Sequence, residues 1–448
     1  MNYVFSPLDN RYQKDLPASL SEEANLEAQI EYEKKYLEAL MQEGLCPRID
    51  SAELDRILSG VTFSEIEEIE KTTQHATRAL VEVLALRLQK SGHPKAADWV
   101  HVGVTSFDTV DTAARIRLKN FFSKDFFPQL HLLQKELKRW GLAHSATPQV
   151  GRTHGQWAVP TLFGLVFAES LERIQDIESR LNAALSNLRG QSSGAIGGYH
   201  ALGLLVKNPI QFETKFLKSL GLTPHLASTQ ILPPEDISSV ASEVFHMMSV
   251  VAKLANDLRH LARSEISEIA EGMAPGQVGS STMPQKRNPW NLEHVCSLNK
   301  VLASKLSLIQ MDLITEHQRD LTNSASGRFY IEFFAVAYLM CKRLTRVLTR
   351  MEAYPERMNT HLKSAGSSVF AEAFYVLATK NGVSDAHHKI REASRLAEKT
   401  SQPLMEIALE QKLLPPGFSM KTLEDEVWKG PKQKMQSFVT LWHEKGNG

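Results

Sequence analysis

Apolar residues recur at every seventh position along several long stretches of this chain, and this spacing constrains the fold more than any other feature. One series lies within residues 160–188, and two series offset by three positions follow the helix-start signal at residues 233–236. A seven-residue repeat forms a stripe along one side of a helix, which is buried when helices pack nearly parallel. The sequence therefore predicts an all-α chain with a central bundle of long helices. The series are Phe167, Ile174, Leu181 and Leu188; Ile237, Val244, Val251 and Leu258; and Val240, Met247, Leu254 and Leu261.

Two further long helices are predicted nearer the C-terminus, and strand signals are few. Apolar periodicity predicts one helix from Leu292 to about Glu316 and another from Phe329 to Met351. The glycine-rich stretch 192–199 is the candidate for a short ribbon. Breaks near Val104 and in residues 351–355 separate regions of shorter helices. We expect an N-terminal helical domain (1–104), a central helical bundle domain (105–349) that carries the loop 274–289, and a C-terminal helical domain (350–448).

Composition and missing motifs exclude several classes of protein. The 51 Lys and Arg residues equal the 51 Asp and Glu residues, which argues against bulk binding to nucleic acid or membranes. The chain has three widely spaced cysteines, no apolar run of membrane-spanning length and no start that resembles a signal peptide, so we expect a cytoplasmic protein. P-loop, HExxH, paired CxxC, GxGxxG and GxSxG motifs are absent. We therefore expect neither a metal nor a cofactor.

A loop of unusual composition interrupts the long helices at residues 274–289, with the sequence APGQVGSSTMPQKRNP. Its glycines let the backbone approach a ligand closely, and the amides of residues 279–283 can cradle a carboxylate or a phosphate. Lys286 adds a positive charge and Asn288 adds an amide group. A simple connector between two helices is the alternative. The crowding of several kinds of polar group at a helix entrance favours an anion site.

Two shorter polar motifs come earlier in the chain. The sequence GRTHGQ at 151–156 places His154 in a glycine-flanked turn at a predicted helix start, where an imidazole can exchange protons. The sequence HVGVTSFD at 101–108 offers the hydroxyls of Thr105 and Ser106 to an anion at a helix N-terminus. A structural histidine is the alternative for the first motif. Helix capping, with Asp108 in the first turn, is the alternative for the second, and there both interpretations can hold.

His75 and a charged segment near residue 320 complete the candidates. His75 lies inside a predicted amphipathic helix, where core packing or a surface position is the alternative. The later segment groups two basic side chains, one acid and one hydroxyl, and a solvated charged surface explains it equally well. Its residues are Arg319, Asp320, Ser324 and Arg328.

Three of these motifs together resemble the signature regions of the fumarase/aspartase superfamily, whose members eliminate fumarate from succinyl-bearing substrates. The motifs are GVTSFD at 103–108, GRTHGQ at 151–156 and GSSTMPQKRNP at 279–289, in the same order as in the superfamily. Within it, the chain most resembles the adenylosuccinate lyases. The resemblance implies a three-region, all-α fumarase/aspartase-like fold. The closer likeness rests on SPLDNRY at 6–12, STQ at 228–230 and QRDLTNS at 318–324 with Arg328.

The resemblance also implies roles for individual residues. Ser280 would remove a proton from the succinyl carbon, and His154 would protonate the leaving nitrogen. Lys286 and the loop amides would stabilise the carbanion, and His75 would contact the substrate and help to orient the acid. Further substrate contacts are implied for Arg11, Tyr12, Gln74, Thr105, Ser106, Thr153, Gln230, Ser281, Asn288, Arg319, Ser324 and Arg328.

The substrate and the assembly are likewise implied by the resemblance. It indicates conversion of adenylosuccinate to AMP, and of the related imidazole nucleotide SAICAR to AICAR. Together with the long apolar seams it favours a homotetramer whose sites draw residues from different subunits, and an elongated monomer or dimer is the alternative. No cofactor, metal, nucleic acid or membrane is implied. The chain has Ala76, Gln285 and His294 where adenylosuccinate lyases usually or often have Asp, His and Asn. Another N-succinyl substrate such as argininosuccinate is therefore an alternative, and a non-enzymatic protein that kept the scaffold is a second one.

Overall fold

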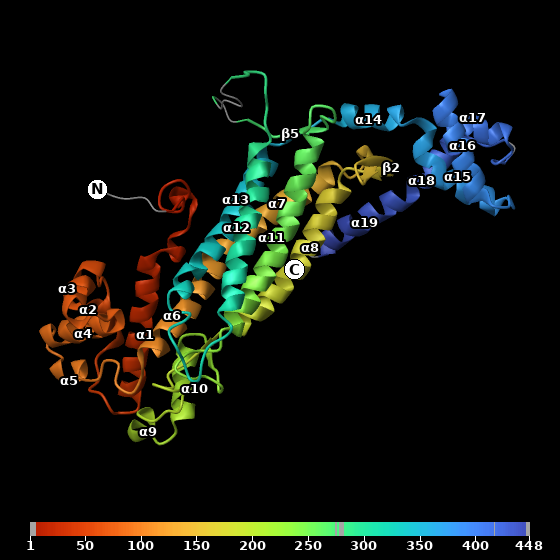
Figure 1. The fold of residues 1–448 in the computed structure, drawn as a ribbon. Helices are drawn as coiled ribbons and strands as arrows, with labels where there is room; N and C mark the ends of the chain where they lie inside the picture. The colour runs from red at the N-terminus through yellow and green to blue at the C-terminus, as the bar shows by residue number, and fades with distance from the viewer. Residues whose placement is uncertain (1–5, 274–275, 277–281, 416, 445–448) are drawn as a thin grey trace. The chain divides into compact units, whose positions relative to one another are not determined.

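The computed structural model describes residues 6–273, 276, 282–415 and 417–444, and most of them are helical (Figure 1). The chain divides into two compact units, and each unit is assembled from three separate stretches. None of the helices in the described ranges combines the length and the apolar composition that a membrane crossing needs. Unit 1 comprises Met1–His131, Asp176–Ser249 and Leu298–Cys341, and unit 2 comprises Leu132–Gln175, Val250–Ser297 and Lys342–Gly448.

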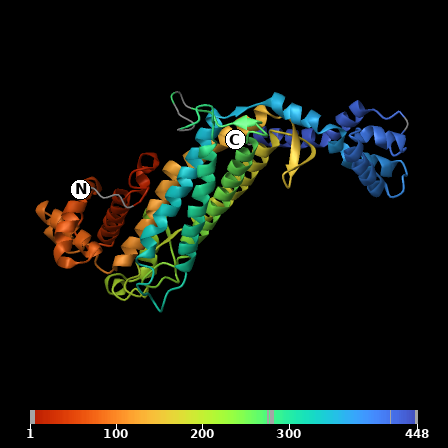
Figure 2. The same ribbon diagram turned by 45° about the horizontal axis from the view of Figure 1, so that its top comes forward.

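Segments of five long helices run side by side (Figure 2), and two of these helices, α8 and α11, carry the seven-residue apolar series. The repeats are buried as predicted: Phe167, Val244 and Val251 have no exposed surface, and Leu254 is only 1% exposed. Burial of a continuous seam is what holds long helices in parallel contact. The prediction of an all-α chain with a long-helix bundle is confirmed. The helices are α7 (Phe127–Ala143), α8 (Leu165–Ser186), α11 (Glu235–Leu261), α12 (Trp290–Met311) and α13 (Tyr330–Arg350).

Contacts within each unit join these helices laterally. In unit 1, Arg180 on α8 pairs with Glu243 on α11 at 3.0 Å, and Lys305 on α12 pairs with Glu332 on α13 at 2.5 Å. In unit 2, the indole N–H of Trp140 on α7 donates to a backbone carbonyl of α13, the oxygen of Leu348, at 2.7 Å. Polar links at the edges of an apolar seam fix the register of neighbouring helices.

Helix α12 ends earlier than its apolar pattern predicts. The sequence suggested a helix to about Glu316, but α12 ends at Met311, and Leu313 and Ile314 are 36% and 80% exposed. The side-chain amide of Asn323 donates to the carbonyl oxygen of Asp312 at 2.7 Å. This contact satisfies a backbone acceptor that the ending helix leaves open, and it turns the chain into the following loop.

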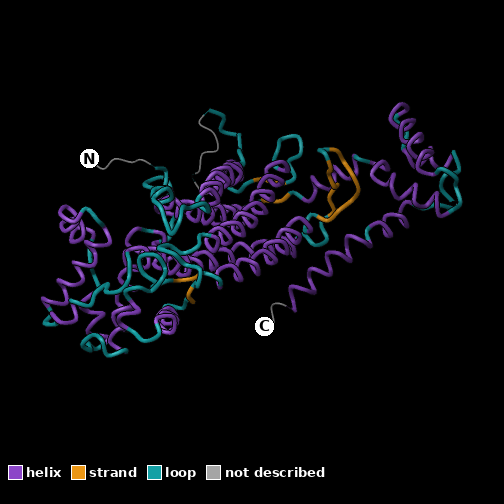
Figure 3. Tube along the Cα trace, turned by 60° about the horizontal axis from the view of Figure 1, so that its bottom comes forward, coloured by secondary structure: helices purple, strands orange, loops and turns teal. Residues whose placement is uncertain are grey.

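The prediction of a β-ribbon at residues 192–199 is wrong. A β-hairpin lies instead between α7 and α8 in the chain (Figure 3). Strands β1 (Pro148–Thr153) and β2 (Gln156–Leu162) pair antiparallel with a bulge between Val150 and Arg152. The stretch 192–199 follows the two-residue strand β3 and contains no strand itself. The short strands are β3 (Arg189–Gly190) with β4 (Thr223–Pro224), parallel, and β5 (Ile269–Ala270) with β6 (Glu352–Ala353), antiparallel.

Unit 1 contains a further set of helices besides its segments of the bundle. Capping residues begin several of them; for example, the Thr62 backbone N–H donates to Glu65, and the Glu65 N–H donates to the Thr62 hydroxyl. These helices are α1 (Glu22–Gln42), α2 (Ser51–Leu58), α3 (Phe63–Thr73), α4 (Ala76–Lys90), α5 (Pro94–Ala97), α6 (Ser106–Phe121), α9 (Leu202–Leu205) and α10 (Pro209–Ser219), with 3₁₀ turns at Gln13–Asp15, Ala18–Leu20 and Ser326–Phe329 and a π-helical turn at Phe122–Phe126.

The C-terminal part of unit 2 forms its own apolar core. Phe374, Ile390, Leu404 and Ile407 are almost completely buried together, and Val150 of strand β1 joins the same cluster. The hairpin therefore packs against the C-terminal helices. These are α14 (Pro355–Ser364), η5 (Gly366–Phe370), α15 (Ala371–Lys380), α16 (Ala386–Thr400), α17 (Leu404–Glu410), α18 (Met420–Val427) and α19 (Lys429–Glu444).

Candidate active site

His154 lies at the tip of the β1–β2 hairpin in unit 2, not at a helix start as the sequence suggested. His154 and Gly155 form the two-residue turn, with φ of 55° and 75°, and Thr153 pairs with Gln156 on either side of it. Positive φ at both central residues matches the twist of a tight hairpin, and glycine adopts it without strain. The next helix, α8, begins only at Leu165. The imidazole of His154 and the side chain of Thr153 are exposed in the single chain.

A buried carboxylate holds this hairpin in place. Glu268 has no exposed surface and accepts hydrogen bonds from Arg152 Nη2 at 2.6 Å and from Gln149 Nε2 at 2.6 Å. The Nδ1 atom of His361 on α14 lies 2.7 Å from the same carboxylate. Burial alone would raise the pKa of Glu268, but the hydrogen bonds from Arg152, His361 and Gln149 outweigh it and lower the pKa. Because Arg152 stands two residues before His154, this network fixes the strand that leads to the imidazole.

The loop that carries the serine pair is fastened at its base. Glu271 accepts hydrogen bonds from the backbone N–H groups of Asn291 and Leu292 at 3.1 and 3.3 Å, and also binds the side-chain amide of Asn291. Arg343 on α13 donates to the side-chain oxygen of Asn291 at 2.6 Å. Glu271, three residues before the loop, thus ties the segment that leads into the loop to the first turn of α12. Burial raises the pKa of Glu271, although its hydrogen bonds to Asn291 and Leu292 act in the opposite direction.

Close packing at the start of this loop requires glycine. A Cβ atom at Gly272 would lie 1.9 Å from the carbonyl oxygen of Arg350. Further along, Lys286 is exposed and its backbone N–H donates to Met283 at 3.0 Å, while Asn288 is half-buried. Ser280 and Ser281 lie outside the described residues.

Unit 1 brings Thr105, Ser106 and His75 together. The sequence predicted His75 inside a helix, but His75 instead caps the N-terminus of α4. Gln74, just before it, adopts a left-handed conformation (φ 49°) that ends α3. The Nδ1 atom of His75 accepts the backbone N–H of Arg78 at 3.2 Å, so the neutral ring carries its proton on Nε2. That Nε2 atom lies 3.5 Å from the hydroxyl oxygen of Ser106. His75 therefore presents a hydrogen-bond donor toward Ser106.

A second buried carboxylate organises the turn at Thr105. Asp108 has no exposed surface and accepts the backbone N–H of Thr105 at 2.8 Å, which confirms the predicted capping role. It also accepts the N–H groups of Ser193 at 3.1 Å and Gly194 at 3.0 Å from a distant loop. Burial raises the pKa of Asp108 to about 7, although the amides of Thr105, Gly194 and Ser193 lower it. This carboxyl joins two loops of unit 1 that are far apart in the sequence.

Gln230 and Arg319 lie in the same neighbourhood of unit 1. The backbone N–H of Gln230 donates to the carbonyl of Gln318 at 3.2 Å. The Arg319 guanidinium lies 3.4 Å from the centre of the Phe107 ring, which orients the cation through a cation–π contact. Phe107 directly follows Ser106. The structure therefore brings the predicted residues Ser106, Gln230 and Arg319 close to one another.

Four predicted contacts are not joined to this group. Arg11, Ser324 and Arg328 are exposed, and Tyr12 is half-buried. The Ser324 hydroxyl donates locally to the Leu321 carbonyl at 3.0 Å. In the described part of the chain, no hydrogen bond or ion pair connects any of these four side chains with another predicted site residue. Their roles stay predictions.

Sequence reasoning missed Glu268 and Glu271 and saw Asp108 only as a helix cap. All three acids stand beside sequence motifs or loop ends, where acidic residues are common. No sequence pattern distinguishes the acids that become buried from those that stay exposed. Glu265, three residues before Glu268, has a side chain that is 61% exposed. Within the described residues, no group of three or more His, Cys, Asp or Glu side chains is arranged to hold a metal ion.

Comparison with known proteins gives consistent results along the chain. A family model described as lyase matches residues 9–303, and one described as adenylosuccinate lyase C-terminal matches residues 315–422. Curated relatives include adenylosuccinate lyases from Archaeoglobus fulgidus (28% identity, covering 98% of both chains), Pyrococcus horikoshii (30%, covering 94% of this chain and 93% of the relative) and Helicobacter pylori (30%, covering 84% and 83%).

Solved structures share the fold at lower sequence identity. A fumarate lyase from Mesorhizobium sp. BNC1 superposes with a TM-score of 0.82 at 19% identity, covering 98% of this chain and all of the other. The 3-carboxy-cis,cis-muconate lactonizing enzyme from Pseudomonas putida gives 0.79 at 24% identity, covering 97% of this chain and all of the other. At these identities the likeness establishes the fold alone.

The Glu268 network gives a first prediction. Replacing Glu268 with Ala should lower the free energy of unfolding by about 3–5 kcal/mol, because Arg152 would keep a largely buried charge without its acceptor. Urea unfolding followed by circular dichroism measures the change. The matched control is Glu265→Ala, which removes an exposed carboxylate and should have little effect. Equal effects of the two variants would contradict the role given to Glu268.

The raised pKa of Asp108 gives a second prediction. Between pH about 4 and about 7 the folded protein keeps a proton that the unfolded chain releases at the ordinary pKa of 3.8, so this carboxyl makes the fold less stable as pH rises. Asp108→Asn cannot titrate. From pH about 5 to about 8, the stability of the wild type relative to this variant should fall by at least about 1 kcal/mol. A pH-independent difference in stability between the wild type and Asp108→Asn would rule out the raised pKa.

Proposed function

Since this chain belongs to the adenylosuccinate lyase family of the fumarase/aspartase superfamily, we propose that it eliminates fumarate from adenylosuccinate to give AMP. It also converts SAICAR to AICAR with release of fumarate, and both reactions belong to purine biosynthesis. The observation that carries the proposal is a 30% identical adenylosuccinate lyase that aligns with 94% of the chain. The adenylosuccinate lyase C-terminal match at residues 315–422 favours this substrate over argininosuccinate.

The direct test follows the reaction of the purified full-length chain with adenylosuccinate, without added metal. AMP and fumarate should appear in equal amounts, as separated by liquid chromatography. Argininosuccinate serves as the matched substrate control, because it carries the same succinyl group without a nucleotide. Turnover of argininosuccinate with none of adenylosuccinate would reject the proposed substrate.

In the proposed mechanism, the signature loop supplies the base and the stabilising charge. Ser280 removes a proton from the succinyl carbon, and negative charge develops on the neighbouring carboxylate. Two first-turn amides of α12, those of Asn291 and Leu292, are already bound to Glu271. The developing charge must therefore be met by the loop amides, Lys286 and Asn288 rather than by those two amides.

His154 acts as the general acid that protonates the leaving nitrogen. The hairpin that carries it is held by Glu268 through Arg152, which limits the positions that the imidazole can take. His75 contributes an N–H donor and does not serve as a base, since its Nδ1 atom is engaged by the backbone of Arg78. This donor and the hydroxyls of Thr105, Ser106 and Thr153 bind the succinyl carboxylates.

The remaining predicted residues bind the nucleotide and the rest of the substrate. The guanidinium of Arg319 is already oriented by Phe107, which lowers the conformational cost of binding a phosphate or a base. Gln230 is placed beside it by the Gln318 carbonyl. The residues with proposed binding roles are Arg11, Tyr12, Gln74, Gln230, Ser281, Arg319, Ser324 and Arg328.

We further propose a cytoplasmic homotetramer in which several subunits complete each site. The support is that His154, Lys286 and His75 are exposed in the single chain, whereas acid–base chemistry of this kind needs a cavity closed to water. Exposed apolar residues near the end of α12, such as Met311 at 73%, also favour an interface. The three-part division at residues 1–104, 105–349 and 350–448 is part of this proposal.

The roles of Ser280 and His154 lead to a third prediction. Ser280→Ala and His154→Ala should each reduce kcat for adenylosuccinate at least ~100-fold, because a positioned acid or base contributes on that order. Initial rates at saturating substrate measure the loss, and circular dichroism confirms that the variants fold. The control His388→Ala removes an exposed imidazole on α16 and should keep the wild-type rate. A near-normal rate in either site variant would exclude that residue from the chemistry.

The proposed assembly leads to a fourth prediction. If Ser280 and His154 of one site belong to different subunits, mixing the two inactive variants and allowing subunits to exchange should restore part of the activity. Light scattering should give the mass of four chains for the wild type. A fully active monomer, or a mixture that stays inactive although hybrid tetramers form, would contradict shared sites.

A further inference from the structure

A cavity of about 620 Å³ lies in unit 2 between the base of the hairpin and the C-terminal helices. Its wall includes Pro148 and Leu162, which pair with each other at the open end of the hairpin, and residues of α14, η5, α17, α18 and α19. Of the described residues with a proposed part in the reaction, none lines it. The volume falls within the range of about 300–1,000 Å³ that is typical of pockets for small ligands.

The inner wall of this cavity is apolar and aromatic. Leu162 and Phe370 are only 3% and 7% exposed, and Phe370 belongs to the C-terminal core. Met405, Met420 and Trp428 are half-buried and complete the wall. An indole ring offers a flat surface for stacking, and methionine side chains adapt to the shape of a ligand. The wall therefore suits a planar apolar group.

Positive charge dominates the polar side of the same cavity. Lys363 on α14 and Lys432 on α19 line it together with a single carboxylate, that of Glu424. Among the described residues, neither lysine forms an ion pair. The Ser367 hydroxyl already accepts the backbone N–H of Met405 at 3.2 Å, so it fixes the wall. Two ammonium groups against one carboxylate favour an anionic ligand.

We propose that this cavity is a second ligand site, which binds a small aromatic anion. The ring lies against Trp428 and the two methionines, and the carboxylate, sulfonate or phosphate of the ligand lies toward Lys363 and Lys432. Apolar walls with a few convergent polar groups are typical of such sites. This assignment is independent of the proposed function.

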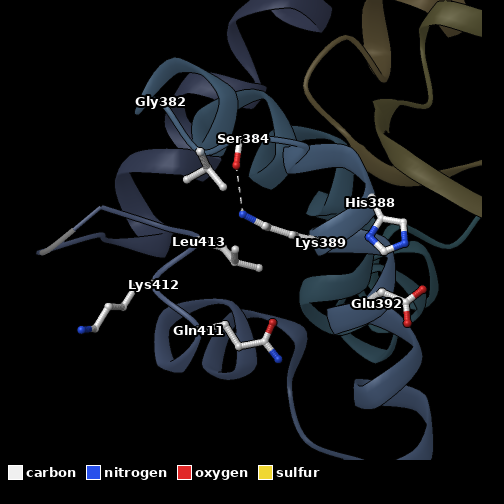
Figure 4. Close-up of a pocket in the computed structure, with 9 residues that line it drawn as sticks. Gly382, Ser384, His388, Lys389, Glu392, Gln411, Lys412 and Leu413 are labelled. Atoms are coloured by element: carbon white, nitrogen blue, oxygen red, sulfur yellow. Dashed lines mark hydrogen bonds between the residues drawn. The ribbon is translucent and has the colours of Figure 1, made fainter.

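A second cavity of about 630 Å³ in the same unit lacks this combination (Figure 4). Lys389 points toward Ser384, with 3.4 Å between Nζ and the hydroxyl oxygen, while the side chain of Lys412 extends away from it. Among the described residues that line this cavity there is no Phe, Tyr or Trp. Its cations do not converge on one point, so we assign no ligand to it.

Ligand binding in the proposed site should be visible in the hairpin. Leu162 and Pro148 form its open end, and α14 carries both Lys363 and His361, which contacts Glu268. A ligand held between these elements should slow their local opening. Hydrogen exchange of the amides in β1, β2 and α14 therefore reports where a ligand binds as well as whether it binds.

The test uses the fluorescent aromatic anion anilinonaphthalene sulfonate and the full-length chain. The probe should bind saturably and slow amide exchange in β1, β2 and α14. Lys363→Glu combined with Lys432→Glu should weaken binding at least about tenfold, because both favourable charges become repulsive. Ala146→Trp, which places a large side chain at the cavity wall, should remove binding. The matched control Lys421→Glu changes an exposed lysine of α18 outside the cavity and should leave the affinity unchanged.

An uncharged analogue, N-phenylnaphthylamine, separates the two parts of the proposal. It should bind the wild type at least about tenfold more weakly than the sulfonate. Equal binding of the two probes, or an unchanged affinity in the double lysine variant, would overturn the assignment of an anion site. Slowed exchange confined to elements other than β1, β2 and α14 would overturn its location. Thermal unfolding of each variant verifies that loss of binding does not reflect loss of the fold.

Discussion

Burial of the seven-residue apolar seams is the interaction on which the rest of this structure depends. Side chains such as Val244 and Val251 have no exposed surface, and each contributes stability only while its helix stays in lengthwise contact with its neighbours. A seam of this kind cannot accommodate charged groups without a large desolvation cost. The groups with proposed chemical roles consequently collect where helices begin, end or connect: at the hairpin before α8, at the loop before α12 and at the turn before α6. This distribution explains why a chain of long helices also contains polar, glycine-rich loops.

Three buried carboxylates hold those polar segments in place. The type of hydrogen-bond donor that each one receives decides whether its pKa is raised or lowered. Glu268 receives a charged donor, Arg152, and its pKa is lowered despite complete burial. Asp108 receives three backbone amides, and Glu271 receives mainly amides of the first turn of α12; for both, burial prevails and the pKa is raised. Every one of these hydrogen bonds has a charged acceptor, but among these donors only Arg152, the donor to Glu268, is a cation. The added attraction between the opposite charges of Arg152 and Glu268 reverses the sign of the pKa shift. The hairpin is therefore held by an ionised acid, whereas the turn at Thr105 is held by an acid that titrates near neutral pH.

In the single chain the proposed catalytic groups His154 and Lys286 are open to solvent, and this bears on the proposed function. His154 is exposed at a hairpin tip, and Lys286 is exposed within the loop 274–289. Water around such groups weakens the electrostatic stabilisation that elimination through a carbanion requires. The fixed hairpin, the fastened loop base and the oriented Arg319 are nevertheless preorganised before any substrate binds. In our proposal, neighbouring subunits supply the missing cover, and the single chain already fixes the positions of these groups.

The sequence by itself determined the helical class, the positions of the buried seams and the residue types available for chemistry, because apolar periodicity and motif composition are local properties. Only the tertiary structure decided that His154 occupies a hairpin turn, since a glycine-flanked turn suits a helix start equally well. It also decided that α12 ends at Met311, where the side-chain amide of Asn323 binds the carbonyl of Asp312, and that His75 caps a helix. The clearest case is the pair Glu265 and Glu268, which are chemically identical and three residues apart. One is exposed and the other is buried among Arg152, Gln149 and His361, because burial depends on partners that arrive from distant parts of the chain.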